Sequence, residues 1–455
     1  MNIQHESEGI EMLMEMKIEN FLSFGERMTS DKNNANTGFS LIADNQLRSS
    51  AREDSVKIDG SDLNVLRLAM ICGKNGSGKS NFVKAAAFIQ QTVLHGLPDG
   101  YRKMFNKTKA DNRSKPSLFE IQFRKGNRKY RYGFEVLLEK GAFIREWLYE
   151  IADNGTQTLL FDRDVQKEYV EVGEVFRDAY SAIQLRFEDL VQEDELLFLT
   201  EINQNRAAFY KKYPEARRLK DAYEWFKDDL CIVSSSLDRR NFIEVNRMNF
   251  CAQLTNVMNA FGYEWESIVS MPRTKLDLLA YLPEQMRSDV EMELEQRQTK
   301  NKDFCALIRA PHDLYMIQSK QENAPQNEMN SAVEFHQLLF KYKGSDALFR
   351  LSDESEGTAD LIALSALLLT GRSRTFVIDD YGRNWHPLLA KRFAEMILDA
   401  SMRNDARQLI ATTHHTIFLQ SGQLGANAVW FLDKEEGNSQ FTDLKASNML
   451  FKNTE

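Results

Sequence analysis

The sequence contains few cysteines and no long apolar run. Four cysteines are scattered over 455 residues without C-x-x-C spacing, which argues against a disulfide framework or a zinc site and favours a reducing compartment. No apolar run approaches the roughly 20 residues that a transmembrane helix needs. The N-terminal stretch is acidic and lacks the basic and apolar regions of a signal peptide. We therefore expect a cytoplasmic protein with no membrane partner.

An excess of positive charge is missing as well. The net charge of −9 argues against a protein that coats nucleic acid, although it leaves room for a local basic surface. The sequence also lacks the sustained heptads of a long coiled coil and any H-N-H or other metal-nuclease cluster. These absences leave an ordinary soluble chain, long enough for roughly three domain-sized units.

The most informative stretch runs from Gly73 to Ser80 and matches the phosphate-loop pattern G-x-x-x-x-G-K-[ST] at every fixed position. An apolar run at 65–71 predicts a buried strand before it, and apolar residues at helical spacing predict a helix after it. Glycines let successive backbone N–H groups face one anion, and the helix N-terminus adds partial positive charge. We predict ATP and Mg²⁺ binding, with Lys79 reaching the β- and γ-phosphates and Ser80 a ligand of Mg²⁺. The expected nucleotide-binding residues here are Gly73, Asn75, Gly76, Gly78, Lys79, Ser80 and Asn81.

Two acidic residues follow a β-prone strand at 375–378. Because parallel strands present ligands at their carboxyl ends, we expect Asp379 to hold Mg²⁺ and Asp380 to orient the attacking water. Without the phosphate loop, an Asp-rich turn after a strand would explain these residues equally well. Lys79 and Asp379 are 300 residues apart, so a large insertion must divide the nucleotide core.

Two further segments carry candidate phosphate contacts. Ser355 and Gly357 precede a predicted helix at 359–369, where a hydroxyl, bare backbone N–H groups and the helix dipole would form a second anion site. His414 follows an apolar strand at 408–411 and is positioned to donate a hydrogen bond to the γ-phosphate. In isolation, a plain helix N-cap and a polar turn explain these segments at least as well.

The chain divides into three parts by pattern. Alternating residues at 118–150 predict an antiparallel sheet, whereas the charged, helix-periodic stretches 175–190, 214–226 and 283–298 predict a helical insertion. After residue 331, strands and helices alternate, as in a parallel sheet. Residues up to about 14, 30–64 and 318–327 are expected to be loose or loop segments, and 16–21 a first strand. The expected fold class is α/β, with a parallel core sheet, an antiparallel β subdomain and a helical insertion. The expected domains are 15–164, 165–330 and 331–455.

These motifs, taken in order, resemble the ATP-binding-cassette (ABC) type of ATPase head, as in the SMC proteins. More closely they resemble the bacterial AAA-type ATPases of abortive-infection and antiphage operons. The resemblance rests on Ile18–Phe21, the phosphate loop, the strands at 118–149, Glu354–Thr358, the segment from Asp380 to His386-Pro387, and Thr412–His414.

The resemblance implies roles that spacing alone does not. Ser355 and Gly357 would contact the γ-phosphate of a nucleotide held by another subunit, and His414 would be the switch histidine, so that Lys79, Asp380 and His414 form the catalytic set. Two residues depart from the family pattern. Asp380 stands where glutamate is usual, which predicts slow hydrolysis, and Glu356 stands where glycine is common.

The resemblance further implies an ATP-driven sensor or scaffold, a homo-oligomer of at least two copies, that controls a separate effector nuclease in antiphage defence. A toprim-type nuclease is the first candidate and an H-N-H nuclease the second. The alternatives are an SMC-like DNA-repair ATPase acting on DNA ends, against which the missing heptads count, and a regulatory ATPase unrelated to nucleic acid. The basic segment 98–117, with Lys125, Arg128, Lys129 and Arg131, is a candidate surface for nucleic acid or an acidic partner.

Overall fold

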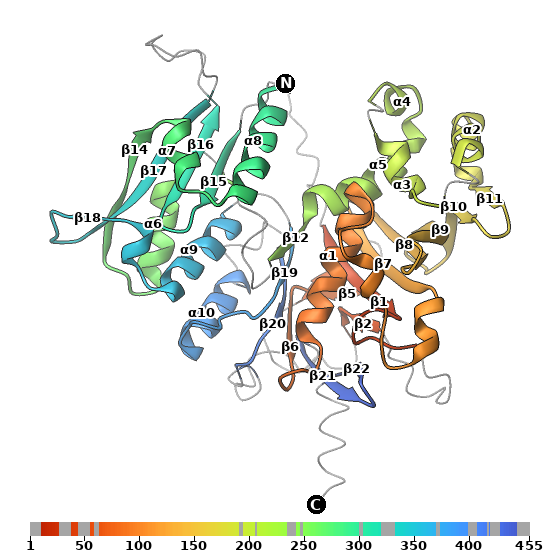
Figure 1. Ribbon diagram of the computed structural model, residues 1–455, viewed down its shortest axis with the longest axis horizontal. Coiled ribbons are helices and arrows are strands. Elements are labelled where there is room, and N and C mark those ends of the chain that lie inside the picture. Colours follow the sequence, from red (N-terminus) through yellow and green to blue (C-terminus); the bar gives the residue numbers. More distant parts are fainter. Residues whose placement is uncertain are drawn as a thin grey trace, which may run out of the picture. The chain divides into compact units, whose positions relative to one another are not determined.

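The computed structural model divides into two compact units (Figure 1). Unit 1 comprises Met1–Ser234, Ser373–Tyr381 and Lys391–Glu455, and unit 2 comprises Ser235–Arg372 and Gly382–Ala390. Each unit is therefore assembled from separate stretches of the chain. The structure describes residues 11–26, 38–43, 55–58, 63–190, 194–204, 207–233, 243–245, 249–299, 304–319, 333–369, 374–398, 407–415, 418 and 428–443.

Unit 1 contains the predicted parallel sheet, with strand order β12-β19-β20-β6-β21-β22. All neighbouring pairs are parallel except the β21–β22 hairpin. Every residue of β6, β19 and β20 is buried, as expected for parallel strands covered on both faces. The strands are β12 (Leu230–Val233), β19 (Thr375–Ile378), β20 (Gln408–Thr412), β6 (Leu68–Cys72), β21 (Val429–Glu435) and β22 (Asn438–Asp443).

Helix α1 (Lys79–His95) follows the phosphate loop and packs on this sheet. Its Phe88 ring lies with its centroid 5.0 Å from that of Phe21 and 4.9 Å from that of Phe119. Phe119 belongs to the antiparallel sheet, so α1 connects the parallel and antiparallel sheets of unit 1 within one hydrophobic core. The expected fold class, α/β with a parallel core sheet and an antiparallel β subdomain, is confirmed.

The antiparallel sheet of unit 1 has the strand order β11-β10-β9-β8-β7-β1-β2. The three strands expected at 118–150 are present as β7, β8 and β9. The sheet contains β1 (Met12–Glu19), β2 (Gly38–Ser40), β7 (Ser117–Lys125), β8 (Arg128–Leu137), β9 (Ala142–Ile151), β10 (Gln157–Asp164) and β11 (Tyr169–Val172).

The expectation of a loose segment up to about residue 14 is wrong for its last residues, because β1 begins at Met12, whereas residues 1–10 lie outside the described residues. Met12, Leu13 and Met14 are buried in the core. The Leu13 backbone N–H also donates a hydrogen bond to the side-chain oxygen of Gln408 at 2.8 Å. Gln408 lies far away in the sequence, so no local pattern predicts this anchor. The described parts of 30–64 likewise contain short strands: β2, β3 (Ile42–Ala43), β4 (Ser55–Lys57) and β5 (Asn64–Leu66).

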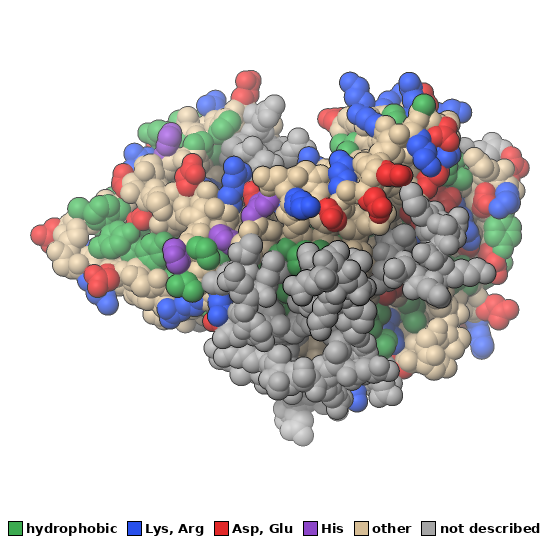
Figure 2. All heavy atoms as spheres, turned by 90° about the horizontal axis from the view of Figure 1, so that it is seen from below, with side chains coloured by type: hydrophobic (Ala, Val, Ile, Leu, Met, Phe, Trp, Pro, Cys, Tyr) green, Lys and Arg blue, Asp and Glu red, His purple; other side chains and the backbone are tan. Residues whose placement is uncertain are grey.

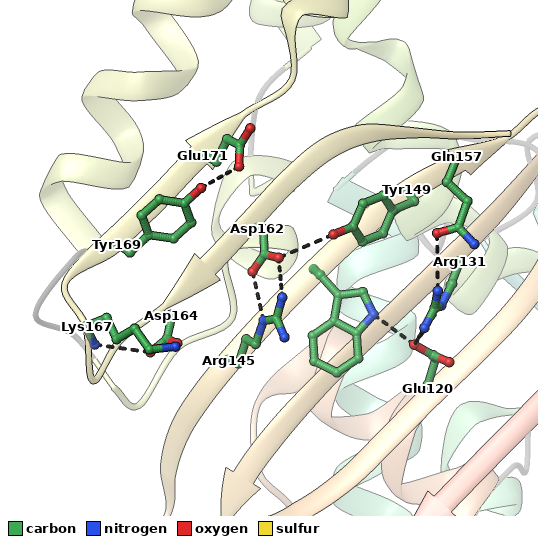
Figure 3. Close-up of polar contacts among 11 residues, drawn as sticks. Glu120, Arg131, Arg145, Tyr149, Gln157, Asp162, Asp164, Lys167, Tyr169 and Glu171 are labelled. Atoms are coloured by element: carbon green, nitrogen blue, oxygen red, sulfur yellow. Dashed lines mark hydrogen bonds and ion pairs between the residues drawn. The ribbon is translucent and has the colours of Figure 1, made fainter.

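One face of the antiparallel sheet is polar and covered with paired charges (Figure 3). Arg145 on β9 donates to both carboxylate oxygens of Asp162 on β10, and Tyr149 donates to the same carboxylate at 3.3 Å. Arg131 donates to Glu120 at 2.7 Å. This sheet therefore shows the alternation of apolar and polar faces that made it predictable.

The predicted helical insertion, 165–330, is not wholly helical. Its described part holds the predicted helices, with α2 at Tyr180–Leu190, α5 at Arg217–Glu224 and α8 at Glu284–Thr299. It also holds strands of a second antiparallel sheet, in unit 2, with the order β13-β15-β16-β17-β14 and with β18 on β17. Within the insertion the strands of this sheet are β13 (Ile243–Glu244), β14 (Trp265–Arg273), β15 (Cys305–Arg309) and β16 (Leu314–Ser319). The sheet is completed by β17 (Val333–Tyr342) and β18 (Leu348–Phe349), which follow the insertion.

Strands were expected after residue 331, where β17 and β18 lie, but these two strands belong to an antiparallel sheet and not to the parallel one. Strands β13 to β16 were missed, and β14 was missed because its partner strand is distant in the sequence. Trp265 of β14 pairs with Tyr342 of β17 across the intervening helices, and the burial of β14 does not alternate regularly. The other elements between residues 174 and 280 are η4 (Glu174–Phe176), α3 (Phe198–Asn203), α4 (Ala207–Lys212), η5 (Pro214–Ala216), η6 (Trp225–Asp229), α6 (Phe250–Ala260) and α7 (Lys275–Ala280). The division into three domains remains a prediction.

The C-terminal elements match their predicted order. The helix expected at 359–369 is α9 (Glu356–Leu368), and a further helix, α10 (Pro387–Leu398), lies between β19 and β20. The loop predicted at 318–327 lies mostly outside the described residues. No described helix is both long and apolar enough to cross a bilayer. On the face shown in Figure 2, basic and acidic side chains are interspersed over the described surface.

Candidate functional site

The phosphate loop connects the buried strand β6 to helix α1, as its sequence predicts. Gly76 and Gly78 have φ angles of 81° and 107°, which L side chains rarely adopt. Gly78 is also the N-cap of α1, and no side chain caps the helix start. A Cβ at Gly73 would press on the Leu432 carbonyl oxygen, whereas a Cβ at Gly76 would meet nothing. The loop is therefore a glycine cradle with uncapped helix N–H groups, which fits a phosphate.

Lys79 is the first residue of α1 and is only 6% exposed. Its ammonium donates to the carbonyl oxygens of Gly73 at 2.7 Å and Lys74 at 2.9 Å, so it lies against the loop. Burial lowers the pKa of Lys79, and the nearby carboxylates of Asp380 and Asp379 oppose that shift. The arrangement places a cation, two acids and the loop together.

Asp379 lies at the carboxyl end of β19 and is 9% exposed. Its Oδ1 accepts hydrogen bonds from Ser80 Oγ at 3.2 Å and from Thr412 Oγ1, on the neighbouring strand β20, at 2.7 Å. Because Mg²⁺ prefers oxygen ligands, the Ser80 hydroxyl and the Asp379 carboxylate form a donor set that fits this ion. The predicted metal ligands are thus brought together from opposite ends of the sequence.

Asp380 adopts a left-handed backbone conformation, with φ of 56°, which Asp tolerates better than most residues. Its backbone N–H donates to Thr412 Oγ1 at 2.8 Å, which fixes the turn after β19. His414 follows β20, is about half exposed, and holds its Nε2 at 3.8 Å from Asp380 Oδ1. A carboxylate and an imidazole therefore lie side by side at the carboxyl edge of the parallel sheet.

The two remaining predicted loop residues occupy different positions. Asn75 is exposed in the loop. Asn81 donates through Nδ2 to Ser23 Oγ at 2.8 Å, so its side chain braces the loop in this structure. Ser23 and Ser439 were not predicted. Ser439 Oγ donates to the Ser77 carbonyl oxygen at 2.6 Å and lies 2.7 Å from Ser23 Oγ, within hydrogen-bond distance. In the sequence, only the position of Ser439 in a hairpin after β21 could have indicated this role.

Ser355 and Gly357 lie in unit 2, at the start of α9. Ser355 is the N-cap, and its hydroxyl accepts from the Thr358 backbone N–H at 3.1 Å. The Gly357 carbonyl accepts from the Trp385 indole N–H at 2.9 Å. A Cβ at Gly357 would lie 2.6 Å from the Asn384 carbonyl oxygen. The simple N-cap interpretation thus describes the hydroxyl, while close packing explains the glycine.

The strand pair expected to offer a basic surface is largely neutralised by acidic residues. Lys125 pairs with Asp229 at 2.6 Å and Arg128 with Asp221 at 2.8 Å. Lys129 is buried and pairs with Asp153 at 3.0 Å, and Arg131 pairs with Glu120 at 2.7 Å. The acids come from neighbouring strands and helices, so a count of basic residues along one strand could not reveal them. We withdraw these four residues as a binding surface.

The comparison with protein families identifies one match over more than half of the chain. The model described as "AAA domain, putative AbiEii toxin, Type IV TA system" matches residues 68–190 and 273–420. These ranges contain every predicted site residue, including Lys79, Asp379 and His414. A search of curated proteins gives no match to this chain.

The comparison with solved structures gives matches of low TM-score, including the following two. The recombination mediator RecF with ATP, of the RecFOR pathway, has a TM-score of 0.33 and 11% identity, covering 96% of this chain and 100% of that chain. The cbiO1 protein from Clostridium perfringens, part of the ABC transporter complex cbiONQ, has a TM-score of 0.21 and 12% identity, covering 52% of this chain and 63% of that chain. On the family match, this chain belongs to the AAA-domain family described above.

Proposed function

We propose that this ATPase is an ATP-driven sensor or scaffold that controls a partner effector nuclease in antiphage defence. The observation that carries the proposal is the convergence of Lys79, Ser80, Asp379, Asp380 and His414 within unit 1. These residues come from three neighbouring strands and the intervening loops. Such a site holds a nucleoside triphosphate and places a carboxylate where water can be activated.

Each side chain has a distinct task in this proposal. Lys79 binds the β- and γ-phosphates by charge-assisted hydrogen bonds, and uncapped N–H groups of α1 surround the same phosphates. Asp380 accepts a hydrogen bond from the attacking water and orients it. His414 donates to the γ-phosphate and, through Asp380, senses whether that phosphate is present.

Ser80 and Asp379 are the proposed Mg²⁺ ligands. The distance of 3.2 Å between Ser80 Oγ and Asp379 Oδ1 suits two ligands of the same ion. Mg²⁺ bound there would neutralise phosphate charge. Thr412 holds the Asp379 carboxylate at 2.7 Å, so the position of this ligand is set by the strand next to it. We expect hydrolysis to be slow because Asp380 is one methylene shorter than the usual glutamate, so its carboxylate reaches less far toward the water.

The active form in this proposal is a homo-oligomer of at least two copies. One chain carries a single phosphate loop and a single Ser355–Gly357 helix start. By resemblance to the cassette ATPases, the helix start of one copy completes the nucleotide site of another. ATP then bridges two copies and its hydrolysis removes the bridge, which gives a switch.

The proposed partner is a nuclease, as the resemblance to the ATPases of antiphage operons implies. Among the described residues, no group of three or more His, Cys, Asp and Glu side chains could hold a metal ion. The family description names a toxin and a type IV TA system, which supports a role in bacterial defence. A toprim-type nuclease is the first candidate and an H-N-H nuclease the second. The four cysteines are free, in keeping with a cytoplasmic location.

The alternative, an SMC-like DNA-repair ATPase acting on DNA ends, would use a long antiparallel coiled coil. In the described part of 165–330 the longest helix is α8, with 16 residues, or roughly 24 Å at 1.5 Å per residue. Within the described residues, this length counts against the coiled coil that the alternative requires.

The test is to tag this chain in its native operon and purify it with and without ATP and Mg²⁺. We expect the product of a neighbouring gene to copurify, and nuclease activity to appear only with both proteins. Asp380→Ala should change how ATP controls that activity. A protein that purifies without any partner, and hydrolyses ATP with no effect on a neighbouring gene product, would overturn the proposal.

A further inference from the structure

The segment 98–117 of unit 1, between α1 and β7, carries a local excess of positive charge. It contains six basic residues and two acidic ones, Asp99 and Asp111, in a chain whose net charge is −9. Two of the basic residues have acidic partners, Arg113 with Glu139 and Lys115 with Asp111 and Glu26. The other four are exposed: Arg102, Lys103, Lys107 and Lys109.

Buried asparagine side chains hold the backbone of this segment by hydrogen bonds. Asn106 and Asn112 are 0% and 1% exposed, and the Asn112 amide donates to Asn106 Oδ1 at 3.0 Å. Asn20, after β1, donates through Nδ2 to the Asn112 carbonyl oxygen at 2.8 Å. The segment also contains two short 3₁₀ turns, η2 (Tyr101–Lys103) and η3 (Ala110–Ser114). The backbone that carries the four exposed cations is thus held by hydrogen bonds of buried side chains.

The apolar side chains of the segment face inward. Tyr101, Met104 and Phe105 are partly buried and pack against the hydrophobic core of unit 1. Protein–protein interfaces usually need buried aromatic or aliphatic anchors, and this segment presents none among its described residues. Phosphate backbones, in contrast, can be bound by exposed Lys and Arg without an apolar anchor. The chemistry therefore favours nucleic acid over an acidic protein.

The segment also contacts the residues that brace the phosphate loop. Asn106 Nδ2 donates to Asn438 Oδ1 at 3.1 Å, and Thr108 Oγ1 contacts the same oxygen at 3.3 Å. Asn438 is followed by Ser439, whose hydroxyl donates to the carbonyl oxygen of Ser77 in the phosphate loop. A continuous set of hydrogen bonds and one peptide link thus joins the cation-bearing segment to the nucleotide site.

We propose that the Arg102–Lys109 surface binds the phosphate backbone of a nucleic acid, and that this binding acts on the phosphate loop through Asn438 and Ser439. The first part is independent of the proposed function. The second part rests on it, since it needs ATP at Lys79. By linkage, nucleic acid that changes ATP affinity must have its own affinity changed by ATP to the same extent.

The surface is tested by fluorescence anisotropy with labelled single-stranded and duplex oligonucleotides, without nucleotide. We expect wild-type binding to weaken with salt, with a slope of about −3 to −4 in log K against log salt for duplex DNA. The triple variant Lys103→Ala/Lys107→Ala/Lys109→Ala should bind at least about tenfold more weakly and lower that slope by about 2 to 3.

The matched control removes three exposed cations elsewhere in unit 1, with Lys211→Ala/Lys212→Ala/Arg217→Ala. It should bind nucleic acid like the wild type. An equal loss of nucleic-acid affinity in both triple variants, or no binding by the wild type, contradicts the proposal that the Arg102–Lys109 surface binds nucleic acid. Capture of a labelled polyglutamate peptide in place of nucleic acid would assign the surface to an acidic protein and overturn the nucleic-acid proposal.

The link to the phosphate loop is tested with Asn438→Ala and, because Asn438 is central to the network, with the milder Thr108→Val. Both keep the four cations, so we expect nucleic-acid affinity within about twofold of the wild type. Nucleic acid should change ATP affinity in the wild type and less so in both variants. If nucleic acid binds the wild type but leaves its ATP affinity unchanged, the link is overturned while the surface stands. If ATP itself does not bind, the proposed function fails and the anisotropy result is unaffected.

Discussion

Two helix starts in this chain were expected to meet phosphate, and they are built differently. Helix α1 begins after Gly78, has no side-chain cap and carries no acidic residue in its first turn. Helix α9 begins after Ser355, whose hydroxyl already accepts from the Thr358 backbone N–H, and has Glu356 in its first turn. Glu354, next to Ser355, accepts from the Tyr342 hydroxyl at 2.8 Å, and burial raises the pKa of Glu354.

This difference indicates which helix start can bind an anion without help from a second copy of the chain. The α1 start combines bare N–H groups, the helix dipole and the Lys79 ammonium, which all favour phosphate. At α9, a phosphate must share Ser355 with a cap that is itself worth about 0.5 to 2 kcal/mol, and it meets nearby acidic residues. We infer that α1 captures ATP and that α9 only recognises a γ-phosphate already held by another copy.

The largest expected effect is on turnover. Asp380→Ala removes the group proposed to orient water, and general-base groups contribute about 10²- to 10⁴-fold to rate. We expect kcat to fall about a hundredfold or more while ATP affinity stays near the wild-type value. Phosphate release and ATP binding, measured on the same preparation, separate the two quantities. Unchanged turnover would assign water activation to another group.

The second prediction concerns phosphate binding at the start of α1. Lys79→Ala removes charge-assisted hydrogen bonds worth about 1.5 to 3 kcal/mol, so ATP affinity should fall roughly 10- to 150-fold. Equilibrium binding of a labelled ATP analogue measures this loss. The control is Lys74→Ala, since Lys74 is exposed and only its carbonyl oxygen contacts Lys79. Wild-type affinity in the Lys79 variant would refute the assignment of the site.

A mixing experiment tests whether the α9 start serves another copy. Lys79→Ala chains and Ser355→Arg chains should each be inactive alone. In a twofold-symmetric dimer, random mixing leaves one intact shared site in each mixed pair, so roughly a quarter of wild-type turnover should return. No recovery, despite exchange of subunits shown by mass spectrometry of labelled chains, would count against the shared site. Full activity of a strictly monomeric protein at high dilution would do so as well.

The smallest effect concerns stability and compares two glycines. Gly357→Ala forces a Cβ against the Asn384 carbonyl oxygen, and overpacking of this kind costs about 1 to 3 kcal/mol. Gly76→Ala meets no atom but must keep φ at 81°, at a cost of about 1 kcal/mol. Thermal unfolding should therefore show a larger loss for Gly357→Ala. Equal losses of stability in the two variants would mean that the backbone around Gly357 moves to accommodate the Cβ more easily than its packing indicates.

Much of the nucleotide site was predictable because its residues follow local rules. The phosphate loop has a fixed spacing, and its glycines have the positive φ angles that the motif needs. The strand before Asp379 is β-prone and apolar from Phe376 to Ile378, and the carboxyl ends of parallel strands always share one edge. The sequence alone therefore determined the fold class and the residues that meet near Lys79.

Only the tertiary structure decided the rest, because the deciding contacts join residues far apart in the sequence. The β1 anchor depends on Gln408, and the support of the phosphate loop depends on Ser439. The basic strand pair proved to be paired with acids such as Asp221 and Asp229, whereas segment 98–117 keeps four exposed cations. Whether a charged side chain is available to a partner is set by its three-dimensional neighbours, and local sequence patterns do not contain that information.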